Sequence, residues 1–477
     1  MKKLFFIVLF VIAELTAFGY AGYEEVKSFK EGVGAVKLGE GWGFVDKSGK
    51  LVVEAKYEEV QSFNDGLAAV KAEELWGFVD KSGKEIIPPK YEEVLEFKDG
   101  IARVRKNGMY GFIDKSGKEI IPIIYSCVFE KQENRFVANI GGEIDEKGFV
   151  SGGKFSYLDE NGKEISKKYD DAYDLKDGMG MVKAGNKIGF VDKSGKEVIK
   201  PKYDKAWVYS EDMSGVMLNG KWGYIDKSGK EVIKLKYDYV FNFKDGAAVV
   251  NIGGIMNEND EIYGGKEFMI DKSGKVISNE YDIIYEFVNG KAVFVSGNKS
   301  GIIDKSGKEI VKAEYDNIFD SGKNIFLVNN GGTYNADDII TGGVWKLLDS
   351  EGKEIKELEY DIVYNMSGNV FIVEKAGKRG IVDITGKEIV STKYDYLYQS
   401  DESKDYIISI IGMKYDENGG ITDYGKYGVF DADGKEIISP KYEKISGFSE
   451  DMAIIMKKWK YGYIDKSGKE IGSPLKK

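Results

Sequence analysis

The chain has 477 residues, a net charge of −11 and a pI near 5.1. No long basic run interrupts this acidic balance, so the electrostatic footprint of a nucleic-acid-binding protein is absent. The sequence contains no histidine and a single cysteine, Cys127, which excludes Ser/His/Asp and Cys/His catalysis, histidine-ligated zinc and an intrachain disulfide. We expect Cys127 to be a small buried apolar residue.

Glycine and aromatic residues are frequent, with 60 Gly, 31 Tyr and 25 Phe against only six prolines. This composition favours short strands joined by tight turns over long helices. The first expectation for the fold is therefore all-β.

Residues 1–21 have the pattern of a secretory signal peptide. Two lysines precede an apolar run from Leu4 to Ile12, and small residues stand at Gly19 and Ala21. Cleavage after Ala21 would place the mature chain in the periplasm, at the cell surface or in the medium. An uncleaved membrane anchor is the alternative for this segment. No later stretch is long and apolar enough to span a bilayer.

The rest of the chain, residues 22–477, is predicted to be one continuous domain of twelve repeated units of about 34 residues. Each unit contains an aspartate that ends the phrase "aromatic-Gly-aromatic-apolar-Asp" or its variant. The spacing from this aspartate to the tyrosine that opens the next unit is always 10 or 11 residues, so no linker separates any two units. Each unit opens on a tyrosine: Tyr23, Tyr57, Tyr91, Tyr125, Tyr169, Tyr203, Tyr237, Tyr281, Tyr315, Tyr360, Tyr394 and Tyr442.

Within a unit, the pattern predicts an antiparallel meander of three or four strands. The run from Ala102 to Arg105 alternates in polarity with period two, and "KDG", "KNG" and "KSG" punctuate the chain at short intervals. Propellers typically have four to eight blades of about 40 residues or more. We therefore expect an open β-superhelix rather than a closed propeller-like ring, with two six-bladed rings as a further alternative.

The repeated phrase resembles the WG-repeat family of bacterial proteins. A Trp-Gly pair is followed by an aromatic residue, an apolar residue and Asp-Lys-Ser-Gly-Lys in three units: Trp42-Gly43, Trp76-Gly77 and Trp222-Gly223. The resemblance covers residues 23 to about 473. It implies a β-rich repeat array in exported or surface proteins, and it implies no settled biochemical activity. Weaker copies read Tyr110-Gly111, Tyr427-Gly428 and Tyr461-Gly462, and the pattern is departed from at Ile188-Gly189, Glu267-Phe268, Ser300-Gly301 and Arg379-Gly380.

We interpret the repeated residues as structural residues that form turns and packing contacts. The aspartate is predicted to fix a type I turn by accepting backbone N–H groups, and the glycine three residues later to supply a left-handed conformation. The Trp is predicted to pack over the gap left by its glycine neighbour, with stacking on a ligand as the alternative. The turn residues are Asp46, Asp80, Asp114 and Asp226, with Gly49, Gly83, Gly117 and Gly229.

Units 4, 7, 9 and 11 carry 11 to 14 extra residues before the repeated aspartate, as in "NIGGIMNENDEIYGGK". We expect these insertions to be hairpins that project from one face, and such a face is often the binding face. Their acidic tips could supply oxygen ligands to Ca²⁺, although none has EF-hand spacing, and solvated turn tips are the preferred interpretation. The predicted binding residues are Phe149, Tyr263, Tyr334 and Tyr415.

These observations favour an exported, non-enzymatic scaffold that binds a glycan or a protein of the cell envelope or of a host surface. No cofactor is expected, and the oligomeric state stays open. One alternative is a carboxylate-dependent hydrolase of extracellular polysaccharide, although no carboxylate is expected to break the repeat inside an apolar pocket, where a raised pKa would point to catalysis. The other alternative is a passive structural spacer.

Overall fold

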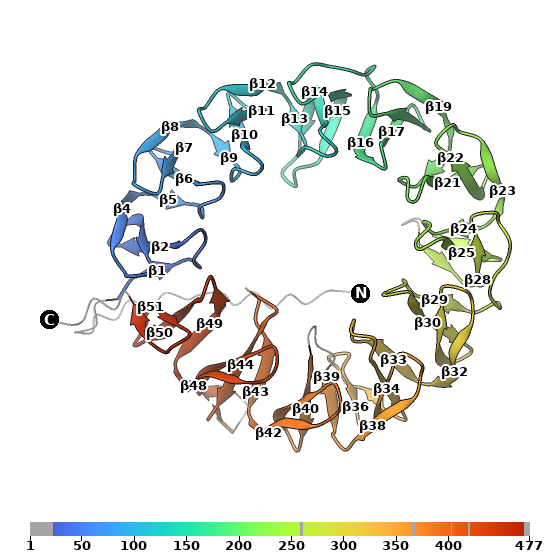
Figure 1. Cartoon of the computed structure of the whole chain (residues 1–477). Helices are drawn as coiled ribbons and strands as arrows, with labels where there is room; N and C mark the ends of the chain where they lie inside the picture. Colours follow the sequence, from blue (N-terminus) through green and yellow to red (C-terminus); the bar gives the residue numbers. More distant parts are fainter. Residues whose placement is uncertain (1–21, 258–260, 365–368, 402, 418–419, 472–477) are drawn as a thin grey trace.

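A computed structural model describes residues 22–257, 261–364, 369–401, 403–417 and 420–471. These residues form twelve small antiparallel sheets of three or four strands, arranged as blades around a central opening (Figure 1). The all-β prediction and the meander within each unit are confirmed. Residues 1–21, predicted to be a signal peptide, lie outside the described residues. In the described part of the chain, no helix has the length and apolar character needed to cross a membrane.

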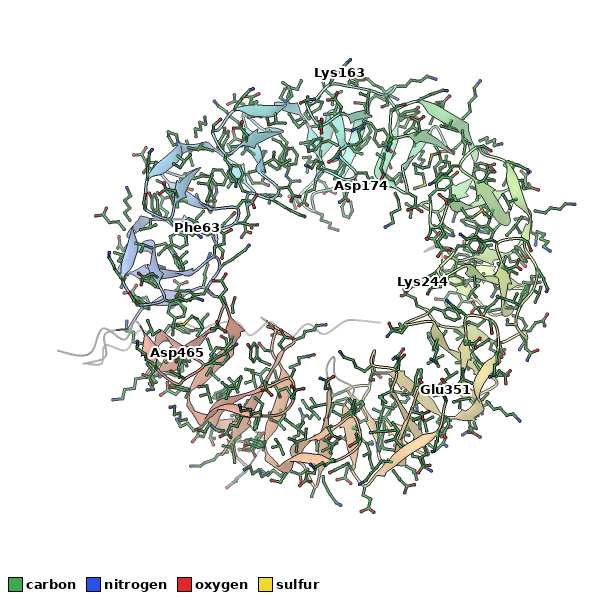
Figure 2. All side chains as sticks on the ribbon, viewed as in Figure 1. Phe63, Lys163, Asp174, Lys244, Glu351 and Asp465 are labelled. Carbon is green, nitrogen blue, oxygen red and sulfur yellow. The ribbon has the colours of Figure 1, made fainter. Side chains whose placement is uncertain are left out.

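The first blade shows how each unit folds. Strands β1 (Glu25–Val26), β2 (Val33–Leu38), β3 (Gly41–Asp46) and β4 (Leu51–Tyr57) pair in chain order. The short first strand lies at the inner edge of the ring and the fourth strand at the outer rim (Figure 1). Figure 2 places Asp174, on the first strand β16 (Asp171–Lys176), and Lys244, which follows the first strand β24 (Tyr239–Val240), at the inner rim, and Lys163, which follows a third strand, at the outer rim.

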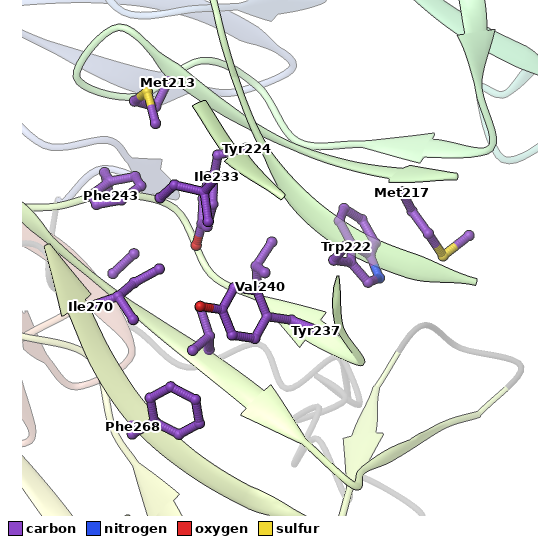
Figure 3. Packing of buried hydrophobic residues seen from close by; sticks show 12 residues of the cluster. Met213, Met217, Trp222, Tyr224, Ile233, Tyr237, Val240, Phe243, Phe268 and Ile270 are labelled. Carbon is purple, nitrogen blue, oxygen red and sulfur yellow. The ribbon is translucent and has the colours of Figure 1, made fainter. Parts of the chain in front are cut away.

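At several junctions, neighbouring blades are joined by a repeated contact between two aromatic rings. A ring on the third strand of one blade meets a ring that follows the first strand of the next blade. The ring centroids are 4.8 Å apart for Phe44 and Phe63, and 4.7 Å apart for Tyr224 and Phe243. Such edge-to-face or tilted pairs add to the free energy gained from burying the rings. Figure 3 shows the buried cluster around Trp222 and Tyr224 at one of these junctions.

The junction between blade 12 and blade 1 has the same contact, so the ring is closed. Tyr463, on β51 (Lys460–Asp465), meets Phe29 of blade 1 with the ring centroids 4.7 Å apart. Its hydroxyl donates to the carbonyl oxygens of Lys27 at 2.8 Å and Ala35 at 3.0 Å. At the junction of blades 6 and 7, the Tyr224 hydroxyl donates to the Phe241 carbonyl in the same way, at 2.5 Å.

Both ends of the described chain also build one sheet. In blade 1, Tyr57 at the end of the outer strand pairs with Trp42. In blade 12 the outer strand β52 (Glu470–Ile471) is short, and Tyr23 from the other end of the chain pairs with Tyr461 through two backbone hydrogen bonds of 3.1 Å. The expected open superhelix is therefore wrong, and so is the alternative of two six-bladed rings, because one chain of blades returns to its own start.

A second repeated contact uses the turn after each first strand. The carboxylate of Glu31 in blade 1 accepts the Gly66 N–H of blade 2 at 3.0 Å, and Asp65 of blade 2 accepts the Gly100 N–H of blade 3 at 2.7 Å. At the closing junction, Glu450 of blade 12 accepts the Gly32 N–H of blade 1 at 2.6 Å. The closing junction is thus built from the same hydrogen bonds as the internal junctions.

The Trp-Gly pair has a packing role in the blades. Trp42, Trp76 and Trp222 are buried. The register between third and fourth strands shifts at the glycine, for example between Trp76 and Phe78. A Cβ atom on Gly77 would lie 2.4 Å from the Ile87 carbonyl oxygen, so only glycine allows the outer strand to approach this closely. The same conflict with outer-strand backbone would arise at Gly43 and Gly223.

The repeated aspartate binds its own turn. In blade 2, Oδ1 of Asp80 accepts the Ser82 N–H at 2.9 Å, the Ser82 hydroxyl at 2.6 Å and the Lys84 N–H at 3.1 Å. Gly83 has a φ of +82°, in the left-handed region that favours glycine. The same bonds and conformation recur in the turns of Asp46, Asp114 and Asp226, where Gly49, Gly117 and Gly229 also have positive φ.

Replacing Asp80 with alanine is expected to lower the free energy of unfolding by about 1 kcal/mol, because backbone donors lose a charged acceptor in an exposed turn. A urea titration of the full chain would measure the change. Ser82→Ala is the matched control, since it removes one of the three bonds and is expected to cost less. Equal stability of Asp80→Ala and the parent would contradict the turn assignment.

The turn aspartates should also make stability depend on acid. The hydroxyl of Ser82 holds the pKa of the Asp80 carboxyl below its ordinary value, and the equivalent serines do the same for the pKa of Asp46 and of Asp114. A lowered folded-state pKa gives stability that is present above the unfolded pKa of about 3.9 and is lost as pH falls further. The thermal midpoint is therefore expected to fall between about pH 4 and pH 2.

The control for this pH dependence is a variant with Asp46, Asp80 and Asp114 changed to asparagine. Its thermal midpoint should be lower than that of the parent at pH 6 and should change less on acidification. A parent protein whose midpoint stays constant or rises between pH 4 and pH 2 would contradict the role of these carboxylates.

Candidate functional site

The four insertions are hairpins on one face of the ring, here called the hairpin face. Neighbouring strands run antiparallel, so every connection between second and third strands leaves its blade on the same side. In blade 4 the long strands β14 (Phe136–Ile144) and β15 (Val150–Leu158) form the hairpin. Blades 7, 9 and 11 carry two-stranded extensions: β26 (Ile255–Met256) with β27 (Ile262–Tyr263), β35 (Thr333–Tyr334) with β36 (Ile340–Thr341), and β45 (Lys414–Tyr415) with β46 (Ile421–Asp423).

A buried asparagine closes the base of three hairpins. In blade 7, Nδ2 of Asn251 donates to the Gly264 carbonyl at 3.1 Å, and its Oδ1 accepts the Gly254 N–H at 3.0 Å. Gly264 and Gly265 have positive φ, which bends the hairpin away from the blade. Asn139 and Asn329 make the same pair of bonds in blades 4 and 9. The paired glycines of the insertions are thus a shared structural device.

The hairpins of blades 7 and 9 contact first strands at the inner rim. Met256 packs against the cluster that contains Trp222, and its sulfur lies 3.8 Å from Nζ of Lys205 on the first strand of blade 6, β20 (Lys205–Ala206). The Tyr334 hydroxyl donates to Oδ1 of Asn317 at 2.7 Å, on the first strand of blade 9, β33 (Asn317–Asp320). These hairpins are therefore anchored to the blades.

The four predicted binding aromatics are exposed. Phe149 is 69 % exposed, Tyr263 59 %, Tyr334 61 % and Tyr415 52 %. They come from blades 4, 7, 9 and 11, so the structure spaces them around the hairpin face and does not gather them into one cluster. Any partner that contacts all four must extend over much of this face.

Trp459 is an exposed aromatic that the sequence analysis missed. It lies in the turn between β50 (Met452–Lys457) and β51, is 80 % exposed and has a φ of +63°. A bulky side chain in the left-handed region is unusual, because glycine and asparagine fit there with less strain. The signal in the sequence is "KKWK", where blades 3, 6 and 10 carry glycine at the corresponding turn.

The acidic tips have partners within their own turns. Asp145 Oδ1 accepts the N–H groups of Lys147 at 2.9 Å and Phe149 at 2.8 Å, and Asp416 Oδ1 accepts the Gly420 N–H at 2.7 Å. Within the described ranges, no group of three or more acidic or cysteine side chains is placed to hold a metal ion.

One carboxylate does break the repeat inside an apolar setting, contrary to the expectation from the sequence. Glu267 of blade 7 stands where blades 1, 2 and 6 have Trp and is 5 % exposed, and burial raises the pKa of its carboxyl. Its Oε2 accepts the Ile284 N–H of blade 8 at 2.7 Å. Glu267 thus joins two blades. Cys127 is buried as expected, and burial raises the pKa of its thiol.

Two hollows lie away from the predicted aromatics. The first, of about 270 Å³, lies at the inner rim, with Leu95 and Phe112 beside charged residues that include Lys98 and Glu130. The second, of about 580 Å³, lies between outer strands β38 (Glu354–Leu358) and β42 (Glu388–Tyr394). Both linings mix lysine and carboxylate side chains, so neither selects a ligand of one charge.

Three of the solved structures that this chain resembles are distant in sequence and structure. A crystal structure of the eukaryotic initiation factor has 10 % identity and a TM-score of 0.34, over 78 % of this chain and 94 % of that chain. The tricorn protease has 12 % identity and a TM-score of 0.23, over 92 % and 53 %. Kluyveromyces lactis Hsv2 has 10 % identity and a TM-score of 0.25, over 53 % and 94 %. These TM-scores are too low to carry an argument about function.

No curated protein matches the sequence. The model of one family, described as WG containing repeat, matches ten segments: residues 42–76, 76–110, 110–142, 155–187, 188–222, 222–254, 268–299, 301–334, 347–378 and 427–460. These segments cover well over half of the chain and fall in phase with the blades. The chain therefore belongs to the WG-repeat family.

Proposed function

We propose that this protein is an exported, non-enzymatic binding ring that contacts a glycan or a protein of the cell envelope or of a host surface through its hairpin face. One observation carries the proposal. Four of twelve near-equivalent blades are lengthened at the same connection, and each extension presents an exposed aromatic side chain on one face. The export part rests on the signal-like pattern of residues 1–21.

The physical basis is the cost of leaving these rings in water. Phe149, Tyr263, Tyr334 and Tyr415 are each more than half exposed, although the blades beneath them bury most of their own aromatic side chains. Tyrosine, tryptophan and phenylalanine supply a large contact area and lose little side-chain freedom on binding, so they are enriched in binding surfaces. The asparagine and glycine residues at the hairpin bases hold this area away from the blade.

The test is binding of the purified ring to isolated cell envelopes. The first variant has the four hairpin aromatics changed to alanine. The second has residues 141–153, 253–265, 331–343 and 412–425 each replaced by Asn-Gly, the two-residue turn of blade 6 at Asn219 and Gly220. Both variants are expected to fold and to lose binding. The matched control changes four half-exposed apolar residues of outer strands: Val198, Val232, Ile355 and Ile389.

Binding that survives unchanged in both hairpin variants would contradict the proposal. Sustained turnover of a glycan by the parent protein would favour the hydrolase instead. A spacer would bind nothing, and its activity in the cell would depend on the number of blades.

A further inference from the structure

A row of aromatic side chains follows the wall of the central opening. The fifth residue of each unit, counted from its opening tyrosine, stands on or directly after the first strand, at the inner edge of the blade (Figure 1). This residue is aromatic in eight consecutive blades, 4 to 11, here called the aromatic belt: Phe129, Tyr173, Trp207, Phe241, Tyr285, Phe319, Tyr364 and Tyr398. Blades 12, 1, 2 and 3 carry Ser446, Lys27, Gln61 and Leu95 at this position.

The belt is open to solvent along most of its length. Tyr285 is 54 % exposed and Tyr173 40 %, while Phe129, Phe241 and Tyr398 are between 37 and 39 % exposed. Figure 2 shows Asp174, the neighbour of Tyr173, at the inner rim. Extended apolar surface of this kind on a soluble protein marks a contact site more often than not.

The rings continue from blade to blade at two junctions. Trp207 lies 5.8 Å from Tyr239 of the next blade, and Tyr239 lies 5.1 Å from Phe241, as distances between ring centroids. At the junction of blades 10 and 11, the Arg379 guanidinium lies 4.6 Å from the centroid of Tyr364 and 4.7 Å from that of Tyr396. Arg379 therefore bridges two rings of neighbouring blades.

A hydrogen-bonding group accompanies nearly every ring of the belt. In seven of the eight units the next residue in the sequence is Asp, Glu, Asn or Gln. Asp174, Asn242 and Glu286 are exposed examples. An aromatic ring thus recurs in each of blades 4 to 11, with a polar neighbour in seven of them, and this pairing offers an apolar face to a sugar ring and a partner to its hydroxyl groups.

We infer that the aromatic belt is a binding site for an extended, neutral polysaccharide. A row of aromatic rings that repeats once per blade over blades 4 to 11 matches a polymer of repeated units better than the irregular surface of a folded protein. The acidic residues beside the rings and the net charge of −11 disfavour a polyanion. The belt consists of other residues than the four hairpin aromatics, so this inference goes beyond the function proposed above and can be tested independently of it.

The test is affinity electrophoresis of the full chain in native gels that contain hydroxyethyl cellulose, mixed-linkage β-glucan, galactomannan or dextran. At least one of the first three is expected to retard the protein. Tyr173→Ala and Tyr285→Ala should each weaken that binding by about three- to tenfold, and Tyr285→Phe should keep it, because the platform is retained. Tyr285 is 54 % exposed and Tyr173 40 %, so truncation of either is expected to lower the melting temperature only slightly.

The controls are Val232→Ala and Ile389→Ala on outer strands, where the exposed fractions of 39 and 40 % match that of Tyr173, and both should bind like the parent. The variant with Phe149, Tyr263, Tyr334 and Tyr415 changed to alanine should also keep polysaccharide binding, which separates this inference from the proposed function. The inference is overturned if none of the gels retards the protein, if both belt variants migrate like the parent, or if the belt residues prove necessary for a protein partner instead.

Discussion

Replacing Trp222 with alanine is expected to lower the free energy of unfolding by about 3–5 kcal/mol. The side chain is fully buried and stacks on Trp207 with the ring centroids 4.9 Å apart and an angle of 13° between the planes. It also contacts the cluster that joins blades 6 and 7, so truncation leaves a cavity at a blade junction. A urea titration followed by circular dichroism would measure the change.

Trp459→Ala is the matched control, because the same residue type is 80 % exposed there, and we expect an effect within about 0.5 kcal/mol. Together the two variants separate packing from ligand stacking. A Trp222→Ala protein with parent-like stability and impaired binding would contradict the packing role of the Trp-Gly pair.

Replacing Tyr463 with alanine is expected to destabilise the protein as much as Tyr224→Ala does, by about 3–5 kcal/mol. The two tyrosines occupy the same place in blades 12 and 6, and both are fully buried. Each meets a phenylalanine of the next blade with the ring centroids 4.7 Å apart and donates its hydroxyl to a backbone carbonyl of that blade. In a closed ring both positions are internal junctions.

An open array would separate these two variants. Tyr463 would then lie at a free end with no blade to cover it, and Tyr463→Ala would cost little while Tyr224→Ala stayed severe. Equal denaturation midpoints for the two variants support closure, and a parent-like midpoint for Tyr463→Ala alone would contradict it.

The blades could be predicted from the sequence because their determinants are local. The Asp80 turn is fixed by bonds within four residues, and the alternation of a strand such as β10 (Ile101–Lys106) is read directly from the chain. The exposed hairpin aromatics also followed from local patterns, since paired glycines and acidic tips mark a hairpin that leaves the sheet.

Closure could not be predicted in this way. It depends on a small rotation between neighbouring blades, set by contacts such as Phe44 with Phe63 and added up over all the junctions. The usual size range of propellers then favoured the wrong alternative. The aromatic belt is not apparent within a single unit, because the fifth position varies from unit to unit. Tyr173 or Tyr285 shows a pattern only when this position is aligned across all units.

The closed ring is the central claim, because the single hairpin face and the belt both depend on it. Electron microscopy of the purified full chain, viewed down the ring axis, tests it most directly. The predicted result is a closed annulus of twelve blade densities around one central opening. An open arc, a superhelix with separated ends or a pair of smaller rings would contradict the account.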